Sequence, residues 1–121
     1  MDEMKLGVME GHFADMIWQN EPIASGELVK RALTDFGWKK STTYTVLKKL
    51  IDRGMFKNEN GVVTSLISRE QFDSMQSEKF VNETFNGSLP AFIAAFASRK
   101  PLTTKEIQEI QKMIDEFGKE E

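Results

Sequence analysis

Hydroxyl and lysine side chains recur at helical spacing between residues 39 and 53. Positions three and four residues apart share a helix face, so an inner face of Val46, Leu47 and Leu50 leaves the polar side chains outside. A helix of this kind can enter the major groove of DNA, where hydroxyls bond base edges and ammonium groups neutralise phosphates. We expect bases to be read by Ser41, Thr42, Tyr44 and Thr45, and phosphates to be met by Lys39, Lys40, Lys48 and Lys49.

The charge distribution agrees with this chemistry. Residues 24–57 carry eight basic and three acidic side chains, whereas residues 68–121 carry seven basic and ten acidic ones. The whole chain has a formal charge of −3, so the basic character belongs to its middle alone. A basic segment joined to an acidic tail is expected when one part of a protein meets a polyanion.

The order of predicted elements indicates how that helix is held. Helices are expected over 8–20, 25–36 and 41–53, the second with a buried stripe of Leu28, Val29, Ala32, Leu33 and Phe36. Two helices joined by a short turn are typical of a helix-turn-helix. Asn60-Gly61 then predicts a β-hairpin with a type I′ turn, and Ile23 is expected to pair briefly with one of its strands. Three helices followed by a hairpin form a winged helix.

The remaining sequence predicts helices alone. Capping boxes at Ser68–Gln71 and Thr103–Glu106, and Ser88 with Pro90, mark three helix starts. The last two helices are too short to bury their apolar side chains alone, which favours pairing with a second copy of the chain. We therefore predict a mainly helical α+β protein with a winged helix-turn-helix domain (1–68) and a helical dimerisation region (69–121). The expected dimer contacts are Leu89, Phe92, Ile93, Phe96, Leu102, Ile107, Ile110, Met113, Ile114 and Phe117.

Several function classes find no support in the sequence. The chain has no cysteine and a single histidine, His12, which excludes a structural zinc site. It also lacks a phosphate-binding glycine loop and a nucleophile elbow, so we expect neither a cofactor nor catalysis. No segment reads as a signal peptide or a membrane span, and a cytoplasmic protein is expected.

Motifs along the chain resemble a known family. The first helix, the passage into the third helix and the C-terminal region each contribute residues in a fixed order. These residues are Glu10, Phe13, Ala14, Ile17 and Trp18; Trp38, Ser41-Thr42, Thr45, Leu47, Leu50 and Arg53-Gly54; and Phe80-Val81, Phe85-Asn86-Gly87, Phe92, Leu102 and Glu106-Ile107. In this order the chain resembles, over about residues 6–117, the penicillinase repressor family, which includes copper-responsive relatives.

The resemblance implies a homodimer that represses its target genes by occupying operator DNA. In β-lactam-responsive members a membrane sensor-transducer leads to cleavage at an Asn–Phe bond, which would imply a sensor-protease partner. The matching bond here is Ala95–Phe96, so the asparagine is missing. The wing tip, residues 58–60, also departs from the family because it is not basic. Metal sensing through cysteine thiolates, as in copper-responsive relatives, is excluded by the composition.

Two other interpretations stay open. A winged helix can serve as a protein-interaction module, with the basic segment docking on an acidic partner instead of double-stranded DNA. A small molecule could also bind between the core and the arm, near Trp18, Trp38 or the phenylalanines. We expect these tryptophans to pack in the core and no polar groups to converge on such a ligand.

Overall fold

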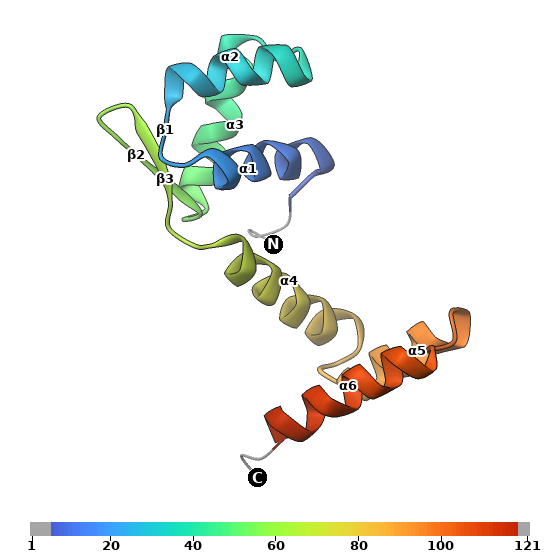
Figure 1. Cartoon of the computed structure of the whole chain (residues 1–121). Coiled ribbons are helices and arrows are strands. Elements are labelled where there is room, and N and C mark those ends of the chain that lie inside the picture. The colour runs from blue at the N-terminus through green and yellow to red at the C-terminus, as the bar shows by residue number, and fades with distance from the viewer. Residues whose placement is uncertain (1–5, 119–121) are drawn as a thin grey trace. The chain divides into compact units, whose positions relative to one another are not determined.

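The computed structural model describes residues 6–118 and shows a mainly helical winged-helix protein, which confirms the predicted fold class (Figure 1). Its elements, in chain order, are α1 (Val8–Asn20), β1 (Ile23–Ala24), α2 (Ser25–Phe36), α3 (Lys40–Asp52), β2 (Phe56–Glu59), β3 (Val62–Ser65), α4 (Arg69–Thr84), α5 (Leu89–Arg99) and α6 (Thr104–Phe117).

The chain divides into two compact units, and the boundary between them lies within α4, between Ser77 and Glu78. The domain boundary predicted from the sequence, at residue 68, lies nine residues before the boundary between the two compact units. The start of α4 belongs to the first unit because Phe72 packs against its core and Arg69 forms an ion pair with Asp15 of α1.

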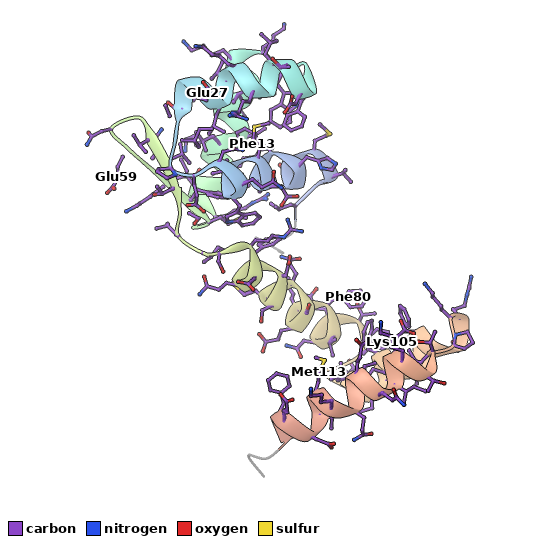
Figure 2. The ribbon with its side chains drawn as sticks, in the orientation of Figure 1. Phe13, Glu27, Glu59, Phe80, Lys105 and Met113 are labelled. Carbon is purple, nitrogen blue, oxygen red and sulfur yellow. The ribbon has the colours of Figure 1, made fainter. Side chains whose placement is uncertain are left out.

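The core of the first unit is built from apolar residues of every element up to β3. Phe13 and Ile17 of α1, Leu28 of α2 and Leu50 of α3 are completely buried, and Figure 2 marks Phe13 among them. Met55, Phe56 and Val63 close the core from the side of the sheet. Each fully buried side chain of this size stabilises the fold by roughly 1.5–3 kcal/mol, so this core holds the three helices in place.

One position differs from the predicted burial, and one buried polar position was not predicted. Leu33 was expected in the buried stripe of α2, but its side chain is 59% exposed. It lies about 100° around the helix from the buried Ala32, outside the narrow strip that meets the core. Conversely, the polar Thr43 of α3 is only 1% exposed. Its hydroxyl donates to the carbonyl of Lys39 at 3.2 Å, which satisfies the buried polar group.

The sheet confirms the predicted hairpin and the pairing of Ile23. Its strand order is β1-β3-β2, all antiparallel, with Ile23 opposite Val63. Asn60 and Gly61 have φ values of 55° and 81°, the left-handed pair that a type I′ turn requires. The Glu21 carboxylate accepts hydrogen bonds from the Ser65 backbone N–H (2.7 Å) and hydroxyl (2.8 Å), which ties the wing to the end of α1.

The second unit contains the end of α4 together with α5 and α6. Its phenylalanines form a cluster of edge and tilted ring contacts, with centroid separations between 5.6 and 6.4 Å for Phe80, Phe85, Phe92 and Phe96. Thr103 and Glu106 form the predicted capping box at the start of α6. No described residue of α5 or α6 is buried in the single chain. Across residues 6–118, no helix combines the length and apolarity that a bilayer crossing requires.

Candidate DNA-binding surface

The N-terminal turn of α3 exposes polar groups suited to a phosphate. Lys39 is the N-cap residue, and no side-chain hydrogen bond caps the start of this helix. The first backbone N–H groups of α3 therefore remain available, and the helix dipole makes this end positive. Lys39 and Lys40 are both exposed, and neither has an ion-pair partner within residues 6–118. An anion approaching this turn would meet two ammonium groups and backbone donors together.

The hydroxyls predicted to read bases lie on the exposed side of α3. Ser41, Thr42 and Thr45 are exposed, as the inner face of Thr43, Leu47 and Leu50 requires. Thr45 donates its hydroxyl proton to the Ser41 carbonyl at 2.9 Å. Its oxygen retains acceptor capacity, so towards a base edge Thr45 offers an acceptor and a methyl group.

Tyr44 joins the exposed face of α3 to the start of α2. Its ring is 37% exposed, and its hydroxyl lies 3.4 Å from the Ser25 hydroxyl. The backbone N–H of Ser25 in turn donates to the Gly61 carbonyl of the wing turn at 2.8 Å. Sequence reasoning missed the role of Ser25, because its partners Tyr44 and Gly61 are far away in the chain. This linkage fixes the position of Tyr44 relative to both neighbouring elements.

Lys48 also projects from the exposed face. Its ammonium group lies 3.0 Å from the Asp52 carboxylate, one helical turn away, and the two side chains are 76% and 62% exposed. Exposed pairs of this kind contribute little stability and are readily exchanged for another anion. Lys48 is therefore free to leave Asp52 for a phosphate.

Lys49 differs from the other predicted phosphate contacts because it faces α1. Its ammonium group lies 3.7 Å from the carboxylate of Glu10, which also lies 3.5 Å from the Arg53 guanidinium. The Glu10 side chain is only 20% exposed. The hydrogen bond donated by the Gly7 backbone and the charges of Arg53 and Lys49 together hold the pKa of Glu10 below its ordinary value. Sequence reasoning identified Glu10 as a residue of the family resemblance but missed this bridge to α3, whose partners lie some forty residues away.

The wing contributes a pair of opposite charges. Lys57 lies 3.1 Å from Glu59, and both side chains are substantially exposed. Figure 2 marks Glu59 on the wing. The described wing tip therefore offers no net positive charge to a phosphate, so the basic groups of α3 must supply most of any attraction to a polyanion.

The bond predicted as a cleavage position lies within α5. Ala95 and Phe96 are both exposed, with the Phe96 ring 47% accessible. The backbone on either side is helical from Leu89 to Arg99. Cleavage at this bond stays a prediction.

Comparison with known proteins agrees with this architecture. The family model described as Penicillinase repressor matches residues 6–116. The penicillinase repressor of Bacillus licheniformis is 26% identical over 105 residues, covering 84% of this chain and 82% of that protein. The penicillinase repressor of Staphylococcus aureus is 23% identical over 123 residues, covering 97% and 96%. Because the family match takes in both compact units and confirms the resemblance seen in the motifs, this chain belongs to the penicillinase repressor family.

Proposed function

We propose that this protein is a transcriptional repressor that binds operator DNA as a homodimer through the exposed face of α3. The observation that carries the proposal is the N-terminal turn of α3, where exposed hydroxyls stand beside two lysines that have no ion-pair partner among residues 6–118. Membership of a family of repressors supports the same function. It acts by occupying DNA and requires no catalysis or cofactor.

Phosphates are met at the edges of this face and bases at its centre. Lys39 and Lys40 meet one strand together with the backbone donors of the first turn, and Lys48 meets a phosphate after leaving Asp52. Ser41, Thr42, Tyr44 and Thr45 read base edges in the major groove. Lys49 is the weakest of the predicted contacts, because a phosphate must compete with the largely buried Glu10 carboxylate for its ammonium group.

Pairing of two copies through the second unit explains the exposure of its apolar side chains. Phe92, Ile93, Leu102 and Ile110 lie between α5 and α6 around an apolar hollow of about 220 Å³. The other six predicted dimer contacts are between 47% and 75% exposed, and they are Leu89, Phe96, Ile107, Met113, Ile114 and Phe117. Exposed apolar side chains gathered in so short a segment mark a protein interface. A symmetric partner would present two copies of α3 to half-sites about one DNA turn apart.

The decisive experiment measures DNA affinity by fluorescence anisotropy on a duplex from the protein's own promoter region, at increasing salt. The double variant Lys39→Gln/Lys40→Gln is expected to bind DNA at least about tenfold more weakly. The slope of log affinity against log salt is expected to fall by about two units, because two phosphate contacts are lost. The matched control, Lys105→Gln/Lys112→Gln in α6, removes the same charge and leaves the affinity nearly unchanged.

Equal losses of DNA affinity in both double variants would show that the net charge of the protein, and not this surface, drives binding. If the unmodified protein does not bind promoter DNA at low salt, the proposal is wrong. The basic segment would then favour the alternative function, docking on an acidic protein partner.

A further inference from the structure

A second site is indicated by a hollow in the first unit, between α1 and the first turns of α4. The hollow measures about 460 Å³, within the range of small-molecule sites in proteins. Its apolar walls include Trp18 and Phe72, whose ring centroids are 5.6 Å apart at an angle of 47°. His12, Asp15 and Arg69 provide polar groups at the same place. Polar side chains therefore converge on this hollow, which was not expected from the sequence.

Gly11 lines this hollow and leaves open space beside it. It shares a face of α1 with Asp15 and Trp18, which follow it by four and seven residues. A Cβ atom placed on Gly11 would meet nothing within 4 Å, and its backbone is ordinary helix. Glycine destabilises a helix interior relative to alanine, and no neighbour in the described chain requires it here. A large side chain at this position would instead extend into the space beside Trp18.

The charges around the hollow favour a cation over an anion. The Arg69 guanidinium is already held by two carboxylates: it bonds Asp15 and lies 3.1 Å from Asp73. Asp15 and Arg69 line the hollow and Asp73 lies beside Arg69, so two carboxylates surround a single guanidinium. The same guanidinium stands 5.7 Å from the centre of the Trp18 ring, so a cation–π contact already forms at the wall of the hollow.

We propose that the hollow beside Gly11 binds a small aromatic molecule that carries one positive charge, an arylalkylamine. Its ring lies in the space beside Gly11 and packs on Trp18 and Phe72. Its ammonium group lies towards Asp15, which it shares with Arg69. This site is separate from the DNA-binding surface of α3 and does not depend on the proposed function.

The proposal is tested by NMR titration of the full-length ¹⁵N-labelled protein with two probes that share one ring system. 1-Naphthylmethylamine is a cation at about pH 7, and 1-naphthylacetate is an anion. The cation is expected to shift the amide signals of Gly11, His12 and Arg69, and to bind about threefold to fivefold more tightly than the anion.

Two variants assign the binding to this hollow. Gly11→Leu fills the space and is expected to abolish binding of the cation, whereas Gly26→Leu, at an equally open helical glycine in α2, leaves it intact. Asp15→Asn removes one carboxylate and is expected to erase the preference for the cation. Circular dichroism confirms that each variant is folded, and Asp15→Asn provides an independent test should Gly11→Leu fail to fold.

Three results would overturn the proposal: no binding of either probe, tighter binding of the anion, or unchanged binding by folded Gly11→Leu. Shifts confined to residues of the second unit would place the ligand elsewhere and would likewise reject this site.

Discussion

Glu10, in the first turn of α1, lies 3.5 Å from the guanidinium of Arg53 at the end of α3, and accepts a hydrogen bond from the backbone N–H of Gly7 at 3.1 Å. One carboxylate thus caps α1 and also anchors the C-terminal end of the helix that carries the candidate DNA contacts. Because it lies between the two helices, its ionisation couples the stability of the first unit to pH.

Replacing Glu10 with glutamine is expected to destabilise the protein by about 0.5–1 kcal/mol at neutral pH, since the cap and the ion pairs both favour the charged carboxylate. The pKa of Glu10 is lowered by folding, so its contribution is present above its ordinary value of 4.5 and lost as the pH falls through the lowered value. The difference between unmodified protein and Glu10→Gln should therefore vanish in acid. Urea unfolding at neutral and acidic pH measures this difference in the free energy of unfolding. The control variant Glu109→Gln is expected to leave the free energy of unfolding unchanged at both pH values. A difference that persists in acid would contradict this account.

Lys48→Ala is expected to weaken binding to every DNA sequence and to reduce the slope of log affinity against log salt by about one unit. Asp52→Asn, at the partner of Lys48, is expected to act in the opposite direction and tighten binding, because it removes a negative charge beside a phosphate. Anisotropy titrations of operator and random duplexes at several salt concentrations measure both effects. If the two variants shift affinity in the same direction, the assignment of Lys48 to a phosphate is wrong.

Thr45→Ala is expected to relax base preference at one operator position, with little change on random DNA, because it removes an acceptor and a methyl group. Thr45→Ser keeps the hydroxyl, and with it the bond to the Ser41 carbonyl, but loses the methyl. Binding to a set of operators substituted one base pair at a time separates these contributions. Equal losses on operator and random DNA would reject a reading role for Thr45.

Ile114→Glu is expected to convert a dimer into monomers, since it places a charge at a 53% exposed apolar position of α6. Gln108→Glu adds the same charge to α6 outside the predicted contacts and is expected to leave the dimer intact. Sedimentation velocity of both variants at matched concentration measures their oligomeric state. An unmodified protein that is already monomeric, or an Ile114→Glu variant that stays dimeric, would exclude pairing through this face.

Local features of the sequence were sufficient for much of the fold. The Asn60-Gly61 turn and the capping boxes at Ser68 and Thr103 depend on residues no more than three positions apart, so their physics is contained in a short segment. The period of apolar residues likewise predicted each helix, and the order of motifs predicted the family. What could not be read in this way was the degree of burial. Leu33 is apolar yet exposed, and Thr43 is polar yet buried, because burial depends on which neighbour covers each helix face.

The tertiary structure alone decided which charges meet. Glu10 and Lys49 are distant in sequence, and only the packing of α1 against α3 reveals that a predicted phosphate contact already has a carboxylate beside it. In the same way, the sequence shows Gly11 as one glycine in a helix, whereas the position of α4 makes it the floor of a hollow beside Trp18. Short-range propensities determine the elements. Pairs of residues far apart in the chain interact only through packing, which the local sequence does not encode.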